Sequence, residues 1–363
     1  MRYLRYMLLF IPLAVLAEFA LHNPVLVFVL SALALIPLAG LLGEATEELA
    51  IHTGPRIGGL LNATLGNAAE LIITIVALQA GKFELIKASL TGSIIGNLLL
   101  ILGFALLMGG LRNGIQRFDQ RLTGMAASMM FLAVIGLLIP TLFELLVEIQ
   151  ENRLNVSELG VRDPRLDRIS LGVAAVLIVI YVLSLIYQLR AGNTTSHSGI
   201  SETEEIAEHQ ARWGARLSLG VLAASTIAIV VMSEFLVGVV EPVATSLGVR
   251  ELFLGVIIIP IVGNVAEHLV GVQAALKNQM DLSMTISLGS SMQIALFVAP
   301  LLVFISLLFG QELTLFFSLF EVMALLLSVV IATFISVDGE SNWLEGAMLL
   351  AVYIILGLGF FYL

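Results

Sequence analysis

Two glutamates of this chain lie in long apolar stretches, each three residues after the asparagine of a Gly-Asn pair. The motifs read GNAAE, ending at Glu70, and GNVAE, ending at Glu267. Glu70 is the only charged residue of positions 57–81, and in positions 252–276 His268 is the only ionisable neighbour of Glu267. An apolar run of this length crosses a bilayer, so both carboxylates are predicted near its middle. A charge there costs at least about 2.5 to 3.5 kcal/mol, which indicates an ion-binding or proton-binding role.

The two motifs belong to an internal repeat. A shift of 197 residues aligns positions 58–93 with positions 255–290 without a gap, and 9 of the 36 aligned pairs are identical. The identical pairs include Glu70 with Glu267 and Gly92 with Gly289. Glycines such as Gly92 are also explained by close helix packing alone, whereas two buried glutamates in register are not.

Composition places the chain among polytopic membrane proteins. Hydrophobic residues make up 59% and charged residues 12% of it, and the mean hydropathy is +1.05. Cysteine is absent, which excludes disulfides and thiolate metal sites. The net charge of −10 and the lack of a basic patch argue against nucleic-acid binding.

Eleven apolar spans are predicted, joined mostly by short loops. They cover residues 3–21, 25–43, 56–80, 89–110, 122–146, 169–189, 217–240, 252–276, 282–309, 313–337 and 343–363. We expect an all-α membrane protein with an additional N-terminal helix (1–23), a first five-helix repeat (24–190), an acidic linker (191–216) and a second five-helix repeat (217–363). Cleavage of the first span as a signal peptide is the alternative for residues 1–21.

Five spans are an odd number, so equivalent helices of the two repeats must cross the membrane in opposite directions. Inverted repeats of this kind are typical of secondary transporters, whose substrate site lies between the repeats at interrupted helices. Interruptions are predicted at Asn62, Thr64 and Gly66 before Glu70, and at Pro260 and Gly263 before Glu267.

The distribution of Lys and Arg predicts the orientation. Ten of them fall on the side of the N-terminus and seven on the other. The N-terminus is therefore predicted in the cytoplasm and the C-terminus outside.

Other acidic residues flank the motifs. Glu47 and Glu234 each belong to a [Thr/Ser]-Glu-x-Leu pattern on the first helix of their repeat, which favours a cation-attracting portal over an ordinary helix end. The linker sequence SETEEIAEH has a capping box and predicts a short acidic helix. This helix is either a solvated linker or a calcium-sensing element. Its acidic residues are Glu202, Glu204, Glu205 and Glu208.

The motif sequences resemble those of the calcium/proton exchangers, the CAX-type branch of the calcium/cation antiporters. The segments LLNATLGNAAELIITIVAL, TGSIIGNLLLILG, IPIVGNVAEHLVGVQAAL and LGSSMQIALFVAP carry this similarity, which extends from about Leu33 to Leu363. The resemblance implies a Ca²⁺/H⁺ antiporter in which Glu70 and Glu267 bind calcium and protons alternately. It also implies a regulatory acidic helix between the halves, a prokaryotic cell membrane more readily than a vacuolar one, and no prosthetic group.

Two glutamates are too few for calcium, which takes six to eight oxygen ligands. Asn67 and Asn264 precede the glutamates by one turn, and the next helix of each repeat adds further polar residues; packing between helices is the alternative role of each. The additional candidate ligands are Ser93, Asn97, Ser290 and Gln293. His268 has no counterpart in the first repeat and is a candidate for tuning Glu267 or for a hydrogen bond. Mn²⁺ and Cd²⁺ suit the same oxygen donors, and a monomer and a homo-oligomer in the bilayer both fit the composition.

Charge alone predicts coupled exchange. Two ionised glutamates with one Ca²⁺ sum to zero charge, and so do two protonated glutamates without metal, whereas the empty dianionic site carries two costly buried charges. A Na⁺/Ca²⁺ exchanger of the same superfamily and a cation channel are the alternative functions. An enzyme is disfavoured because no nucleophile motif or cofactor loop accompanies the glutamates.

Overall fold

The computed structural model describes residues 4–54, 57–58, 61, 64–150, 164–191 and 212–363. Within these residues, nine helices are long and apolar enough to cross a membrane. Two shorter apolar helices, Tyr6–Leu21 and Ala68–Gln79, raise the number to eleven. The predicted all-α membrane architecture is therefore confirmed.

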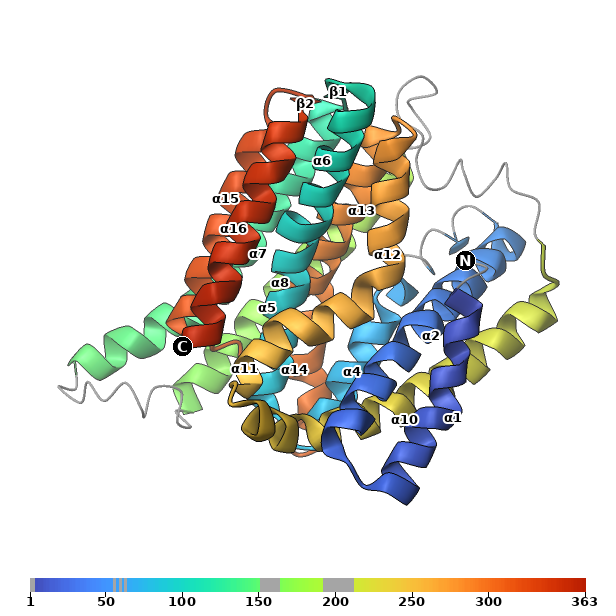
Figure 1. Cartoon of the computed structure of the whole chain (residues 1–363). Coiled ribbons are helices and arrows are strands. Elements are labelled where there is room, and N and C mark those ends of the chain that lie inside the picture. The colour runs from blue at the N-terminus through green and yellow to red at the C-terminus, as the bar shows by residue number, and fades with distance from the viewer. Residues whose placement is uncertain (1–3, 55–56, 59–60, 62–63, 151–163, 192–211) are drawn as a thin grey trace.

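The first half of the chain contains one N-terminal helix and five spans (Figure 1). Its elements are η1 (Leu4–Leu9), α1 (Phe10–Leu16), η2 (Ala17–Leu21), α2 (Pro24–Thr53), α4 (Ala68–Gln79), α5 (Phe83–Ile95), η3 (Gly96–Ile101), α6 (Leu102–Asn113), β1 (Gln116–Arg117), α7 (Gln120–Gln150) and α8 (Pro164–Ala191). The α5, η3 and α6 elements form one continuous span, Phe83–Asn113.

The second half follows the same order. Its elements are α10 (Ala215–Leu247), α11 (Glu251–Phe253), η4 (Leu254–Ile258), α12 (Ile259–Leu276), α13 (Met280–Gln293), η5 (Ile294–Val298), α14 (Ala299–Leu308), α15 (Leu319–Ser336), β2 (Glu340–Ser341) and α16 (Trp343–Tyr362). The span formed by α13, η5 and α14 corresponds to the span formed by α5, η3 and α6 in the first half.

Several helices begin where the sequence supplies a capping residue. The side chain of Asn23 accepts a backbone N–H of the first turn of α2, and Pro24 follows it at a position that needs no donor. Asn342 and Glu345 form a reciprocal capping box at the start of α16. These caps satisfy N–H groups that would otherwise lack partners at a helix end.

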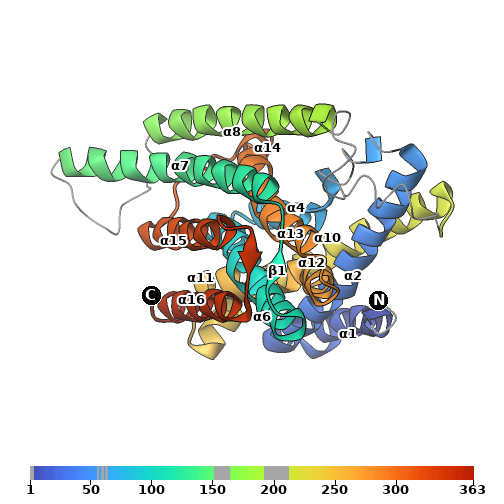
Figure 2. The ribbon, with the colours of Figure 1, turned by 90° about the horizontal axis from the view of Figure 1, so that it is seen from above.

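The two halves pack against each other along most of their length. The helices α2 and α10 lie in contact, α6 packs against α16, and α7 packs against α15. Seen from above, α7 and α8 run side by side along one edge, while α1 and α2 lie on the opposite part of the molecule (Figure 2). The helix α5 lies inside, and its residues 85–95 are buried.

Contacts between loops distinguish the two ends of the helix bundle. At one end β1 pairs antiparallel with β2, and we call this end the ribbon side. At the other end, the Lys82 side, Lys82 Nζ lies 2.7 Å from Glu241 Oε2 and 3.8 Å from Glu251 Oε2. The hydrogen bond that Lys82 donates to Glu241, aided by the charges of Glu241 and Glu251, raises the pKa of Lys82.

The helix α5 crosses the start of the α12 span at Gly92. A Cβ atom on Gly92 would overlap the carbonyl oxygen of Val256 and lie 2.6 Å from Pro260 Cγ. On the other side of the same crossing, a Cβ atom on Gly255 would lie 2.6 Å from the Cβ atom of Ala88. Close packing therefore accounts for Gly92, as one of the two sequence interpretations proposed.

We predict that Gly92→Ala lowers the free energy of unfolding by about 1 to 3 kcal/mol, because the added methyl group must displace backbone atoms of the neighbouring helix. Thermal unfolding in detergent measures the change. Gly172→Ala on α8 is the control, since no described atom lies within 4 Å of its added Cβ. An equal melting temperature for both variants would contradict this account of the crossing.

Candidate functional site

The two motif glutamates approach each other between the repeats. Glu70 lies in the first turn of α4 and is 5% exposed. A Cβ atom on Gly263 of α12 would lie 3.6 Å from Glu70 Oε1, so the Glu70 carboxyl packs against α12 one turn before Glu267. Glu267 follows Gly263 by one helical turn, so both motif glutamates lie at the contact between α4 and α12. Glu267 itself is partly buried.

The helix is interrupted shortly before Glu70. Gly66 and Asn67 form a turn, and α4 begins at Ala68 with Asn67 as its N-cap residue. The Asn67 side chain makes no capping hydrogen bond. Its amide is therefore available for contacts with the second repeat.

The predicted interruption before Glu267 is wrong. The α11, η4 and α12 elements follow one another as one helix, Glu251–Leu276, that bends along its length (Figure 1). Pro260 stands in the first turn of α12, directly after the π-helical segment η4. Inside this continuous helix, Pro260 has no N–H to donate to the preceding turn, and the π-helical segment before it shifts the hydrogen-bond pattern at the same place. The span therefore bends at this place without breaking.

Polar residues of both repeats form one buried hydrogen-bond network, which we call the amide network. Asn67 Nδ2 donates to Gln293 Oε1 at 2.5 Å. Ser290 Oγ donates to Asn67 Oδ1 at 2.9 Å, and Asn97 Nδ2 donates to Ser290 Oγ at 3.0 Å. Four residues that the sequence analysis named as candidate ligands thus contact one another across the repeat interface.

The other two candidate ligands form a second link. Asn264 Nδ2 donates to Ser93 Oγ at 3.2 Å. Asn97 and Asn264 are 0% and 1% exposed, and neither Oδ1 atom has a hydrogen-bond partner within the described part of the chain. A buried amide oxygen without a partner is costly unless a ligand or water satisfies it. Oxygen atoms of this kind are suitable ligands for a hard cation.

A metal at this site would be held by mixed oxygen donors. Among the described residues, no group of three or more His, Cys, Asp or Glu side chains could hold a metal ion. The donors on offer are two carboxylates, amide and hydroxyl oxygens, with water completing the shell.

The sequence analysis missed two π-helical segments beside the site. One is η3, which contains Asn97, and the other is η5, which starts directly after Gln293. With the 197-residue shift, Gly96 of η3 corresponds to Gln293, so the two segments occupy equivalent places in the repeats. Single π-helical turns inside α-helices occur frequently at functional sites. No propensity rule distinguishes these residues from α-helical ones, so the sequence analysis could not predict the π-helical segments.

The remaining predicted residues are His268 beside Glu267, one acidic residue on each of α2 and α10, and four acidic residues outside the described part. His268 is partly buried, and its Nε2 atom has no hydrogen-bond partner among the described atoms. Glu47 is exposed near the end of α2, and Glu234 is exposed on α10. The acidic residues Glu202, Glu204, Glu205 and Glu208 lie outside the described residues.

Two buried glutamates without a role in the sequence analysis have clear partners. Glu48, next to Glu47, is 7% exposed and accepts the backbone N–H groups of Arg212 and Trp213. Glu321 is fully buried at the start of α15, where it accepts hydrogen bonds from the Ser318 N–H and from Thr91 Oγ1. Both carboxylates thus fasten neighbouring segments together.

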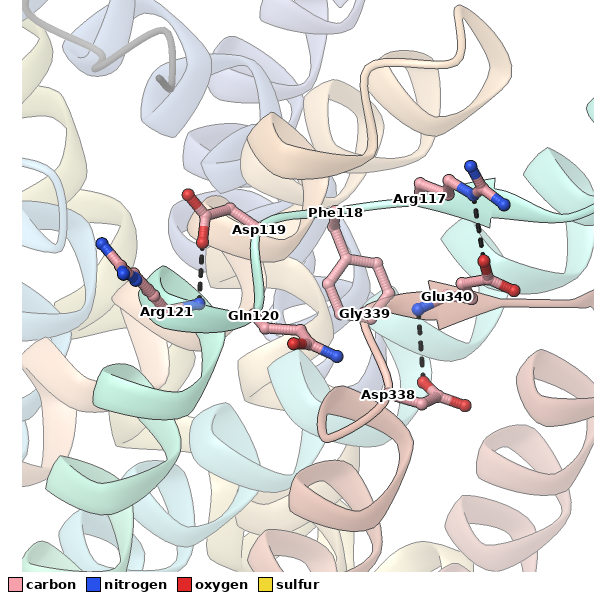
Figure 3. A pocket seen from close by; sticks show the side chains of 8 residues that line it. All are labelled: Arg117, Phe118, Asp119, Gln120, Arg121, Asp338, Gly339 and Glu340. Atoms are coloured by element: carbon pink, nitrogen blue, oxygen red, sulfur yellow. Dashed lines mark hydrogen bonds and ion pairs between the residues drawn. The ribbon is translucent and has the colours of Figure 1, made fainter. Parts of the chain in front are cut away.

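An open pocket lies on the ribbon side, away from the two glutamates (Figure 3). Residues 117–121 and 338–340 line it. Arg117 Nε donates to Glu340 Oε1 at 3.0 Å, and Asp119 and Asp338 accept backbone N–H groups two residues further along the chain. These charged groups hold the loops of the pocket, so the pocket is a less suitable ion site than the buried interface of the repeats.

The chain is similar to known ion exchangers over nearly its whole length. A family profile described as sodium/calcium exchanger protein matches residues 23–190 and 217–362. The Ca²⁺/H⁺ antiporter of Aphanothece halophytica is 44% identical, over 98% of this chain and 95% of that protein. The Ca²⁺/H⁺ antiporter ChaA of Bacillus subtilis is 40% identical, over 97% of this chain and 97% of that protein.

The fold is shared with solved structures. The structure of native YfkE superposes with a TM-score of 0.81 at 37% identity and covers 97% of both chains. Because the family profile spans both halves and these relatives cover almost every residue, the chain belongs to the sodium/calcium exchanger protein family, and the resemblance to its calcium/proton exchanger branch is confirmed.

Proposed function

We propose that this chain is a Ca²⁺/H⁺ antiporter that exports Ca²⁺ from the cytoplasm in exchange for protons, by alternating access at Glu70 and Glu267. The observation that carries the proposal is the approach of these two carboxylates at a buried interface of inverted repeats. The Ca²⁺/H⁺ antiporters that are 40% and 44% identical support the choice of ions.

The ligand set suits calcium. Glu70 and Glu267 supply charge, and the unpartnered amide oxygens of Asn97 and Asn264 supply neutral donors. In this state, Gln293 Oε1 and Asn67 Oδ1 accept hydrogen bonds from Asn67 Nδ2 and Ser290 Oγ. They become available to an ion only when the network opens, which links ion binding to a change in helix packing.

Proton coupling follows from the charge balance of the site. One Ca²⁺ neutralises two ionised glutamates, and two protons neutralise the same pair without metal. The empty dianionic site would hold two like charges in a poorly hydrated interior, at an effective cost of several kcal/mol for each ion. The carrier therefore changes sides with either calcium or protons bound, which is obligatory exchange.

The lysine and arginine distribution supports a cytoplasmic ribbon side. The loop around Arg112, Arg117 and Arg121 lies on the side predicted to hold the N-terminus. Glu47, on the ribbon-side end of α2, would then attract cations from the cytoplasm, and Glu234 on the oppositely directed α10 would act nearer the outer side. A prokaryotic cell membrane is the proposed location.

Transport by the purified chain tests the proposal directly. We expect proteoliposomes with an acidic interior to take up Ca²⁺, with or without sodium, because outward proton flow drives the exchange. Uptake of radioactive calcium under imposed proton or sodium gradients measures this. Uptake driven only by sodium would identify a Na⁺/Ca²⁺ exchanger instead, and calcium flux without any coupled ion would identify a channel.

Glu70→Gln and Glu267→Gln are each predicted to abolish proton-driven Ca²⁺ uptake, since a neutral amide cannot alternate between a cation and a proton. Uptake assays at equal amounts of folded protein measure the loss. Glu312→Gln, a change of an exposed loop carboxylate, should leave uptake at the parental level. Transport that survives both single changes would refute the assignment of the pair.

Asn264→Leu should raise the KM for Ca²⁺ by about 10 to 100-fold, as loss of a group that holds or orients a metal site does elsewhere. Ser93→Ala is the matched control, because it removes the hydrogen bond to Asn264 but leaves the amide oxygen in place. Equal, small effects of the two changes would show that Asn264 only packs the helices.

A further inference from the structure

The turn between α12 and α13 is held by the loop that follows α6. Asn113 Nδ2 donates to the carbonyl oxygen of Ala275 at 3.0 Å. Gln116 Nε2 donates to the same oxygen at 2.8 Å and to Asn278 Oδ1 at 3.0 Å. Two side-chain amides of the first repeat therefore meet at the last turn of the helix that carries the second motif glutamate.

The Gln116 side chain is closely packed against its neighbours. Gln116 is buried, with 1% of its surface exposed. Its backbone is fixed because Gln116 pairs with Ser341 in the β1–β2 ribbon. A Cβ atom on Gly109 would overlap Gln116 Oε1 and would lie 3.1 Å from Ala275 Cβ. The absence of a side chain at Gly109 is thus required for this position of Gln116.

These bonds fix α12 along its axis. Carbonyl groups in the last turn of a helix lack partners within the helix, so groups that bind them determine where the helix end lies. Glu267 precedes Ala275 by eight residues, or about 12 Å along a continuous helix. Any displacement of the anchored end therefore moves the carboxylate of Glu267 relative to Glu70.

The anchor is specific to the second glutamate. With the 197-residue shift, Asn113 and Gln116 correspond to Gly310 and Leu313, which carry no side-chain amide. These two positions therefore provide no counterpart of the amides that bind Ala275. Glu70 is instead positioned from the opposite end of its helix, where Asn67 joins the amide network.

We propose that Gln116 is a positioning residue for Glu267. It fixes the position of α12 along its own axis by binding the carbonyl oxygen of Ala275, and Asn113 is a weaker second anchor. The position of α12 in turn determines the affinity of the glutamate pair for its cation. This inference rests on the proposed antiport function for its transport readout, but the position of the helix can be measured independently.

Two different changes disturb the anchor. Gln116→Leu keeps the volume of the side chain and removes both donated hydrogen bonds, whereas Gly109→Ala leaves Gln116 in the sequence but displaces it. Arg117→Ala, one residue away and with an 81% exposed side chain, is the control. For each variant we measure the KM for Ca²⁺ in proton-driven uptake and the melting temperature in detergent.

The anchor predicts that both changes raise the KM for Ca²⁺ by about tenfold. The double variant should be no worse than either single one, because both changes remove the same interaction. Arg117→Ala should match the parent. A melting temperature that falls while KM stays within about twofold of the parental value would show that Gln116 is only structural, and would overturn the proposal.

A distance measurement separates this inference from the proposed function. The chain has no cysteine, so spin labels can be placed at Leu269 on α12 and Ile354 on α16, which are 42% and 61% exposed. Gln116→Leu and Gly109→Ala should shift or broaden the label distance. An unchanged distance in both variants overturns the anchor, even if the parent exchanges calcium; absence of proton-driven uptake by the parent refutes the antiport function alone.

Discussion

The structure depends on the cost of placing two carboxylates in an apolar interior. Glu70 and Glu267 are tolerated there only with a cation, with protons, or with a polar surrounding. Each is supplied by one repeat, so the site exists only where the two repeats meet. The contacts of α2 with α10, of α6 with α16 and of α7 with α15 hold the two repeats together there.

The inverted repeats are not equivalent in this state. The helix is interrupted before Glu70, where Asn67 forms hydrogen bonds with Ser290 and Gln293 of the second repeat. Before Glu267 the chain remains helical. Gln293 in the second repeat corresponds to Gly96 in the first, and glycine has no side-chain oxygen. The first repeat therefore cannot form the equivalent of the hydrogen bond between Asn67 and Gln293. The two glutamates therefore have different surroundings, and under the proposed function this difference is a physical basis for different affinities for protons and calcium.

The two ends of the bundle are fastened by different chemistry. On the ribbon side, the exposed ion pair of Arg117 with Glu340 accompanies two side-chain amides that bind the carbonyl oxygen of Ala275, and these amide hydrogen bonds do not depend on pH or salt. On the Lys82 side, Lys82 pairs with Glu241 and Glu251 at a partly exposed position. Exposed ion pairs contribute little stability and are screened by salt.

The sequence by itself determined the membrane class, the eleven helices and the inverted repeat, because hydropathy and self-similarity are properties of residue order. It also supplied the residues of the amide network, since buried polar residues are conspicuous in apolar spans. Only the tertiary structure decided that the helix before Glu267 is continuous, that π-helical segments flank the site, and that Gln116 anchors α12. These features depend on contacts between residues far apart in the chain, whose energies outweigh the local preferences that a sequence pattern reveals.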